Sequence, residues 1–528
     1  MELLKKNIRM NRQKSRAVNQ ITLEEDMNVP DNRPDVGSIV QEEGHLRIDE
    51  TKILENQILL SGSLEVKILY IPDEGERQVH RLDTGIPFEE KLNLEGVQTG
   101  DNIRVKWDME DLNVHLINSR KLSIRALVTF AAAIEELYDT QAAVELRGID
   151  EVSVRTKELH PLSLAVQKRD ILRIREEVAL ASNKPNIGEL LWESVQLRGT
   201  DVRVSDGQLD IRGELFIFVL YAGDDENGTK QWMETALPFS GSVECTECRA
   251  GMVPDVEITL AESNLEVRPD YDGEERLVQV EATLDLDIKL YEEEQVEILA
   301  DVYTPVRELI PVTSRETYES LVVRNFSKCR ANERIRMEQN QPRMLQLCHV
   351  RGEIKIDDTR ITDRGVQVDG AVFVSILYIT ADDALPFAAM NGMVPFQHTI
   401  EVEGMDSGCR YTLRTELEQL SAMMIDSEEL EVKAAVNLGV LIVRVHEEEC
   451  MIDVEEKELD LKKLQELPGI VGYIVQPGDS LWNIAKTYYT TPARICELNG
   501  LESEDVRPGR QLLLLKELPG YRAGVKEI

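Results

Sequence analysis

The sequence predicts a mainly β protein, with three tandem antiparallel β-rich domains, sandwich- or barrel-like, followed by a small α+β domain of βααβ order. Three observations support this prediction: one strand pattern recurs three times at fixed spacing, its apolar residues alternate, and the last sixty residues alternate between strand and helix signals. A chain of 528 residues is long enough for three to five such domains.

The repeated strand carries a glycine at its start and a tyrosine eight residues later. A proline follows each tyrosine after seventeen residues, and another precedes each glycine by twenty-eight. Three copies at periods of 151 and then 157 residues indicate whole domains rather than solenoid units. The copies are Gly62–Tyr70, Gly213–Tyr221 and Gly370–Tyr378, and Leu122–Ala126, Val278–Ala282 and Leu430–Ala434 form a further matched strand. The predicted domains are 1–155, 156–312, 313–466 and 471–517.

Alternation within these strands predicts how they are buried. Leu64, Val66 and Ile68 alternate with polar residues, which is typical of a half-buried antiparallel strand. In the second copy Phe216 and Phe218 occupy the other face, so we expect that strand to be covered on both sides.

The two landmark residues have structural explanations. The glycine predicts a bulge or a close backbone approach, and the tyrosine hydroxyl can anchor a strand end. Helical patterns are scarce: we expect helices only over 172–181 and 461–466 upstream of the last domain, and a buried strand over Ala434–Val445.

The composition is strongly acidic, with a net charge of −38. Between Gly472 and Lys516 five acids balance five bases, so the acidity lies upstream. Such a body argues against nucleic-acid binding and suits a basic partner, although many acids simply solvate sheet faces.

The N-terminus has no apolar stretch typical of a signal peptide, and no segment predicts membrane insertion. Seven cysteines at low density predict a reduced, cytoplasmic chain. Cys245 and Cys248 form a lone CxxC without the second ligand pair of a zinc site or the setting of a redox motif.

Sequence signals for catalysis are absent. There is no Walker loop or dinucleotide fingerprint, and the seven histidines fall at different positions in the three copies. We expect no enzyme activity, no catalytic residue, no cofactor and no metal.

The last domain is assigned element by element. Tyr473 begins a short strand, and Asp479 or Ser480 caps a helix whose Leu481, Ile484 and Ala485 lie on one face, with Trp482 covering a second side. A second helix begins at Pro492, ends at Asn499-Gly500, and is followed by a strand over 511–514.

This segment resembles a LysM module, the family known for binding N-acetylglucosamine. The resemblance implies a groove between two loops. Because turns and caps need most of these residues for folding alone, we expect Asp479 and Asn499 to serve the fold first and a ligand second. The implied groove residues are Gly478, Asp479, Ser480, Leu481, Asn499, Gly500 and Leu501. The apolar run Leu512–Leu515 also suits a protein partner.

The whole chain resembles SipL-type spore proteins, whose repeats belong to the SPOCS family; Pro-Asp-Val36 and Pro-Asn-Ile187 support this. The resemblance implies a non-catalytic adaptor in the mother-cell cytosol, at the forespore surface and spore coat. Its LysM would dock a coat-morphogenetic ATPase or another spore envelope protein. The alternative is a peptidoglycan-binding protein whose LysM holds N-acetylglucosamine glycan.

Overall fold

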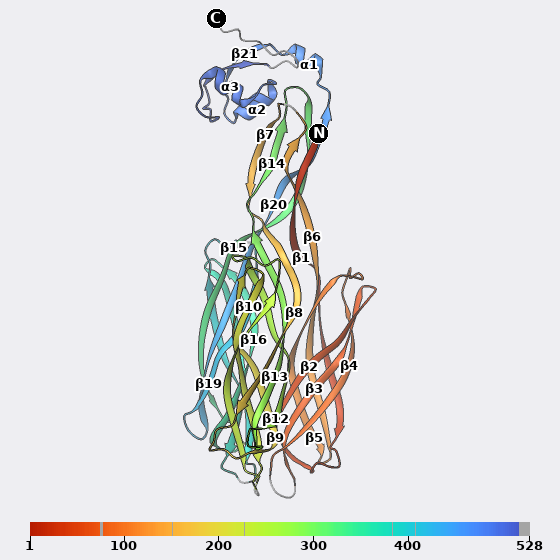
Figure 1. The fold of residues 1–528 in the computed structure, drawn as a ribbon, viewed down its shortest axis with the longest axis vertical. Helices are drawn as coiled ribbons and strands as arrows, with labels where there is room; N and C mark the ends of the chain where they lie inside the picture. Colours follow the sequence, from red (N-terminus) through yellow and green to blue (C-terminus); the bar gives the residue numbers. More distant parts are fainter. Residues whose placement is uncertain are drawn as a thin grey trace.

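A computed structural model describes residues 1–73, 78–149, 151–225, 228–339, 341–382, 384–406 and 408–516. Each repeat contributes six long antiparallel strands (Figure 1). The first has β1 (Glu2–Asn28), β2 (Val36–Leu54), β3 (Gln57–Pro72), β4 (His80–Asn93), β5 (Asn102–Asn118) and β6 (Lys121–Arg147). The second has β8 (Leu162–Ala179), β9 (Ile187–Ser205), β10 (Gln208–Gly223), β11 (Lys230–Glu244), β12 (Val253–Pro269) and β13 (Glu275–Glu293). The third has β15 (Glu308–Arg336), β16 (Met344–Thr362), β17 (Gly365–Thr380), β18 (Phe387–Glu401), β19 (Cys409–Met424) and β20 (Glu429–Lys457).

The six strands of each repeat form two three-stranded sheets around one apolar core. In the first repeat the orders are β1-β6-β5 and β2-β3-β4, and the other repeats follow the same order. The edge strands β2 and β5 lie side by side, as do β1 and β4, so the repeat is intermediate between a sandwich and a barrel. This confirms the predicted fold class.

As predicted, the landmark glycine marks a bulge with a close approach, and the landmark tyrosine anchors a strand end. Strand pairing is irregular beside each glycine, and the phenylalanine of the next strand covers it; a Cβ added at Gly213 would meet the Phe239 ring at 2.8 Å. Each tyrosine hydroxyl donates to the carbonyl of the repeat proline. These pairs are Tyr70–Pro34 at 3.1 Å, Tyr221–Pro185 at 3.2 Å and Tyr378–Pro342 at 3.3 Å.

The three repeats pack around a common axis. The residue before each landmark tyrosine, Leu69, Leu220 or Leu377, is buried in one apolar cluster that all three repeats share. Phe218 lies in the same cluster while Ile217 lies in the core of its own repeat, so β10 is covered on both sides as predicted.

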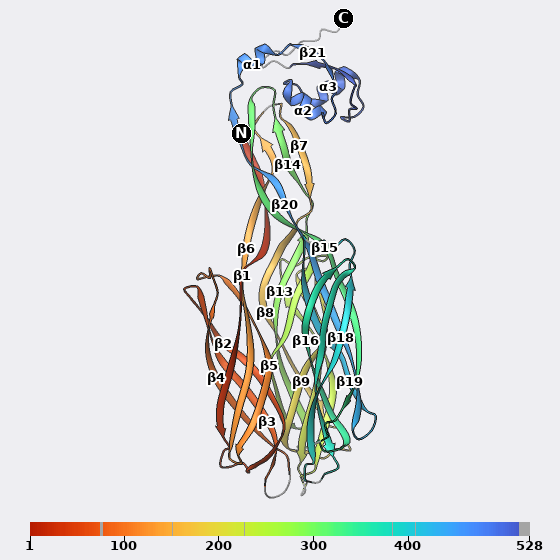
Figure 2. The same ribbon diagram turned by 180° about the vertical axis from the view of Figure 1, so that it is seen from behind.

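Above the repeats, paired strand ends form a stalk made of residues 2–14, 135–147, 153–159, 296–303, 308–320 and 445–457 (Figures 1 and 2). It includes the two connectors between repeats, β7 (Ser153–Leu159) and β14 (Val296–Tyr303), which pair with each other. Ile8, Leu159, Ile298, Tyr318 and Cys450 share its core. The predicted domain limits remain a proposal; β7 crosses the first of them and β15 the second.

The C-terminal module lies at the far end of the stalk (Figures 1 and 2). It is preceded by α1 (Leu461–Glu466) and contains β21 (Ile470–Ile474), α2 (Leu481–Thr487), α3 (Pro492–Asn499) and β22 (Gln511–Leu515). Ser480 is the N-cap of α2, and Gly500 ends α3 with a left-handed φ of 57°. The predicted βααβ order and the helix over 461–466 are confirmed.

The helix predicted over 172–181 is wrong, because the segment belongs to β8 up to Ala179. Leu172, Ile174 and Val178 face the second repeat's core with a period of two, and every residue from 162 to 179 except Ala165 pairs with β13. Long-range pairing therefore overrode the local helical pattern.

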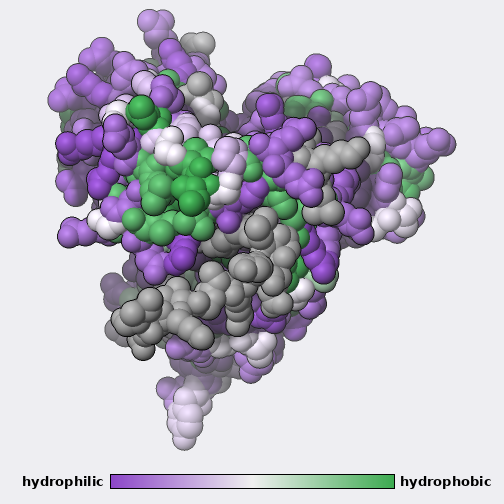
Figure 3. Space-filling view, turned by 90° about the horizontal axis from the view of Figure 1, so that it is seen from above, coloured by the Kyte–Doolittle hydropathy of each residue, from purple (hydrophilic) through white to green (hydrophobic). Residues whose placement is uncertain are grey.

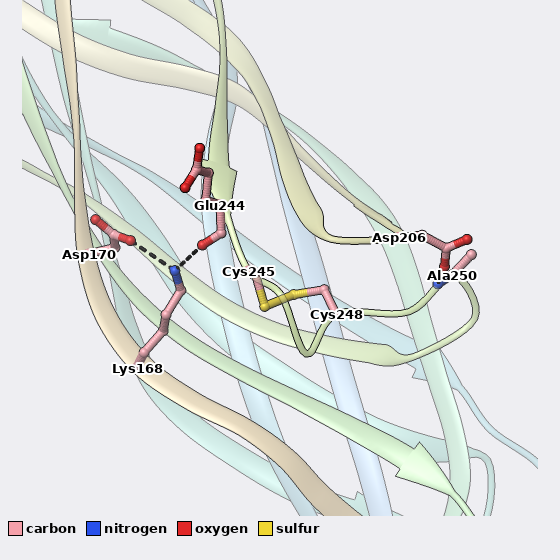
Figure 4. Close-up of a disulfide and its surroundings, with 7 residues drawn as sticks. All are labelled: Lys168, Asp170, Asp206, Glu244, Cys245, Cys248 and Ala250. Carbon is pink, nitrogen blue, oxygen red and sulfur yellow. Dashed lines mark hydrogen bonds and ion pairs between the residues drawn. A yellow bond between two sulfur atoms is a disulfide. The ribbon is translucent and has the colours of Figure 1, made fainter.

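The expectation of reduced cysteines is also wrong for Cys245 and Cys248, which form a disulfide in the turn after β11 (Figure 4). Both sulfurs are buried, and the two half-cystines occupy the positions of the core residues Leu94 and Val97 in the first repeat. Lys168 bonds the Glu244 carbonyl beside them at 2.6 Å. The other five cysteines are free thiols.

Candidate functional site

The candidate site comprises two loops of the C-terminal module, 478–481 and 499–501. The first joins β21 to α2, and the second follows α3. Gly478 and Gly500 are exposed, while Ser480, Leu501 and the two polar candidates Asp479 and Asn499 are half-buried.

Asp479 is occupied by contacts within its own loop. Its Oδ2 accepts hydrogen bonds from the Tyr473 hydroxyl and the Gln476 amide, both at 2.7 Å. The Tyr473 hydrogen bond, followed by that from Gln476, holds the pKa of Asp479 below its ordinary value, and the carboxylate raises the pKa of Tyr473 to about 12. The carboxylate therefore fixes the turn before α2.

Asn499 joins the end of α3 to the closing strand. Its amide nitrogen donates to the carbonyls of Ile495 and Leu513, both at 2.8 Å, and its oxygen accepts from the Leu513 amide at 2.7 Å. All three contacts are to backbone groups. Both polar candidates thus have the structural roles that the sequence predicted.

Of the remaining candidate residues, some stabilise the fold and others lie exposed at the surface. Leu481 is 1 % exposed and belongs to the module's core, and Ser480 caps α2 by accepting from the Asn483 amide at 3.2 Å. Gly478 and Gly500 have positive φ angles of 92° and 57°, and a Cβ at either would meet nothing within 4 Å. The loops therefore present mainly backbone to solvent.

Apolar side chains lie beside these loops. Ile470, Ile474 and Leu513 are 65 %, 52 % and 43 % exposed, and they share the outer face of the β21–β22 pair. Leu513 is the residue whose backbone Asn499 binds. Seen from the C-terminal end, the molecule shows an apolar patch (Figure 3). Of the apolar run 512–515, Leu513 is thus exposed, whereas Leu512 and Leu514 are buried.

The other side of the module is fixed to the stalk, an attachment that no sequence pattern predicted. Asp301 of β14 accepts hydrogen bonds from Trp482 Nε1 at 2.7 Å and from Lys486 Nζ at 2.8 Å. The Tyr303 hydroxyl donates to the Thr490 carbonyl at 3.0 Å, and its ring meets the Trp482 ring edge-on. Trp482 covers a second side of α2, as predicted, but it packs there against β14 of the stalk.

These contacts leave the module little freedom to rotate about its linker. The side chain of Asp301 is only 16 % exposed, and that of its partner Lys486 is 38 % exposed. Hydrogen bonds to a partly buried charge are stronger than those between neutral groups. The two candidate loops are consequently presented in a fixed orientation at the end of the stalk.

Among the residues that the structure describes, no group of three His, Cys, Asp or Glu side chains could hold a metal ion. Over the same residues, no helix is long and apolar enough to cross a membrane.

Comparison with known families agrees with this architecture. The family model for the SipL SPOCS domain matches residues 35–117, 186–268 and 343–425, and the model for the LysM domain matches residues 473–514. No curated protein and no solved structure matches the chain. SPOCS and LysM domains are non-catalytic binding domains. The chain therefore carries three SipL SPOCS domains followed by a C-terminal LysM domain, which is the domain architecture of a SipL-type protein.

Proposed function

We propose that the protein is a non-catalytic adaptor in spore envelope assembly, acting in the mother-cell cytoplasm at the forespore surface. Its LysM domain docks a coat-morphogenetic ATPase or another spore envelope protein through the loops 478–481 and 499–501. The domain architecture supports the sporulation role, and the fixed presentation of the LysM at the stalk end supports docking.

The occupancy of Asp479 and Asn499 is the observation that favours a protein ligand. A sugar site needs polar groups aimed at hydroxyl groups, and because both candidate side chains are committed to the fold, only the loop backbone is left to supply them. The exposed Leu513 and Ile474 beside the loops instead suit the apolar centre of a protein interface.

Glycine substitutions test this proposal without disturbing the structural contacts. Gly478→Asn adds a side chain in the first loop, and asparagine tolerates positive φ better than other residues. Gly509→Asn is the matched control, because Gly509 has a similar φ of 87°, is equally open, and lies in another turn. We expect Gly478→Asn in the full chain to weaken binding to the purified ATPase at least tenfold, and Gly509→Asn to leave it unchanged.

The alternative function is peptidoglycan binding, which the LysM match itself favours. Sedimentation of the same full-length variants with purified peptidoglycan separates the two functions. Retention on glycan that Gly478→Asn abolishes, together with ATPase binding that Gly478→Asn leaves intact, would overturn the docking proposal.

A further inference from the structure

A cavity of about 1030 Å³ lies where the three SPOCS repeats meet. Its lining comes from β2 and β5, from β9 and β12, and from β16 and β19, with parts of β3, β15 and β20. Those three strand pairs hold the same place in their repeats, since each joins the two sheets of one repeat. The cavity therefore lies near the axis that relates the repeats, far from the LysM loops.

Arg198, on β9, brings a buried positive charge to this cavity. It is 5 % exposed, its guanidinium lies 3.9 Å above the Phe216 ring, and one Nη donates to Gln196 Oε1 at 2.7 Å. Its Nε has no hydrogen-bond partner, and among the described residues it forms no ion pair. Burial lowers its pKa to about 10.

Comparison of the repeats shows what Arg198 lacks. Arg47, Arg198 and Lys355 each follow the repeat proline by thirteen residues, so all three repeats place a base here. Arg47 pairs with Glu65 at 3.1 Å, and Lys355 pairs with Asp108 at 3.5 Å.

In the second repeat the position of Glu65 is taken by Phe216. The aromatic face supports the guanidinium but forms no ion pair with it; Glu234 and Glu214 act on its charge only from a greater distance. Of the three equivalent bases, Arg198 is thus both the most buried and the one without an anion.

The rest of the lining does not supply that anion. Its half-buried bases already have carboxylate partners: Arg351 pairs with Glu43, Lys67 with Glu193, and Arg414 with Glu257. The lining acids without an ion pair among the described residues are the exposed Asp201, Glu262 and Glu353 and the half-buried Glu416. The Glu416 carboxylate instead accepts hydrogen bonds from the Thr200 amide and the Asn437 side chain. Of the two fully buried charged side chains in the lining, Asp255 pairs with Arg414, whereas Arg198 has no ion pair in the described chain.

A second unpaired polar group lies on the same strand face. Ser194 is 4 % exposed, lines the cavity, and its hydroxyl has no hydrogen-bond partner. Residues 194 and 198 are separated by an even number of positions, so both side chains leave β9 on one side.

We propose that this cavity is a binding site for an oxyanion, a phosphate or a carboxylate group, held by the Arg198 guanidinium with the Ser194 hydroxyl nearby. The planar guanidinium matches the geometry of either group and binds it through two parallel hydrogen bonds. Because all three repeats line the cavity, a ligand held there favours the state in which the repeats are packed together.

Thermal unfolding of the full-length protein tests the site, with inorganic phosphate and citrate as probes and potassium chloride at equal ionic strength as reference. We expect phosphate, citrate or both to raise the Tm of the wild type above the reference. A rise with phosphate alone assigns the site to phosphate groups, and a rise with citrate alone assigns it to carboxylates.

Three variants make the test specific. Arg198→Gln removes the anchor, and Phe216→Glu keeps Arg198 but supplies the carboxylate that Glu65 provides in the first repeat. Both should lose the rise in Tm, while Arg47→Gln, at the equivalent paired position, should keep it. The proposal fails if neither anion exceeds the reference in the wild type, or if Phe216→Glu retains the full rise, whether or not Arg198→Gln folds.

Discussion

Arg414 Nη1 lies 2.7 Å from Glu257 Oε2, and these two residues hold the same position in the third and second repeats. The first repeat has Lys106 there, 151 residues before Glu257, and Lys106 also pairs with Glu257. One position on the axis thus carries an acid in one repeat and a base in the other two. Three identical repeats would bring like charges together here, so the divergence of this position favours a tandem arrangement over assembly from copies of one repeat.

Removing the acid from this cluster should destabilise the packing of the repeats. Glu257→Gln keeps the size of the side chain but removes the anion that Arg104, Lys106 and Arg414 share. Because Arg414 keeps its bond to Asp255, the free energy of unfolding should fall by about 2 kcal/mol. Urea denaturation of the full chain measures the change. Glu262→Gln, an exposed acid on the same strand without an ion pair in the described chain, is the control and should change it by less than about 0.5 kcal/mol. Equal losses in both variants would contradict this role for Glu257.

The tyrosine that marks each repeat should contribute through its hydroxyl. Tyr221→Phe keeps the buried ring but leaves the Pro185 carbonyl without its donor, so we expect a loss of about 1 kcal/mol in unfolding free energy. Tyr271→Phe changes a fully exposed tyrosine and should have no effect. Urea titrations of the two variants, run side by side, would refute the anchoring role if they coincide.

The repeats were predictable because their landmarks act locally. Gly213 makes room for the Phe239 ring within one sheet, and Tyr221 binds the Pro185 carbonyl at one strand end. Because both contacts lie within one repeat, the spacing of these residues in the sequence was enough to predict the repeats. The helix expected over 172–181 failed for the opposite reason, since pairing with β13, about a hundred residues away, decides its conformation. No local pattern could reveal that partner.

The candidate site shows the same division. Caps and turns such as Ser480 and Gly500 were predictable from residue type, because each serves the helix next to it. Asp301 and Trp482 are 181 residues apart in the sequence, and they meet only because the stalk holds β14 against the module. No hydrophobic periodicity in the sequence predicts the stalk. The orientation of the LysM therefore emerges only from the folded chain.

The disulfide should be replaceable by the residues of the first repeat. Cys245→Leu with Cys248→Val recreates the apolar pair Leu94 and Val97, so this double variant should fold and ignore reductant. Reduction of the wild type should cost about 2 kcal/mol, the loop-closure value for so short a loop. Thermal unfolding with and without dithiothreitol checks both expectations. Equal sensitivity to dithiothreitol in both proteins would show that another cysteine responds.

Tyr489 should destabilise the LysM domain through its backbone. Its φ of 51° lies in the left-handed region, which costs a side chain with a Cβ roughly 1–2 kcal/mol. We expect Tyr489→Gly to slow amide hydrogen exchange in α2 and α3 by roughly tenfold, the factor that corresponds to about 1.4 kcal/mol. Asn56→Gly, at a φ of 55° in the first repeat, is the control and should leave exchange in α2 and α3 unchanged, although it removes the side-chain acceptor of the Gly96 amide. Faster exchange in Tyr489→Gly would mean that the tyrosine side chain contributes more than its strain costs.

The attachment of the LysM to the stalk should depend on pH through Asp301. Burial raises the pKa of this carboxyl, but hydrogen bonds from Lys486 and Trp482 lower it by more, so its pKa lies below the ordinary value. A depressed pKa means that the contact is fully present above about pH 4, the ordinary value for aspartate, and is lost as the pH falls through the lowered pKa. Fluorine NMR of 5-fluorotryptophan-labelled protein should show the Trp482 resonance moving in that window. Asp301→Asn should shift this resonance at neutral pH and remove its titration, whereas Glu297→Gln, an exposed acid on the same strand, should do neither. If the resonance titrates unchanged in Asp301→Asn, another group controls the attachment.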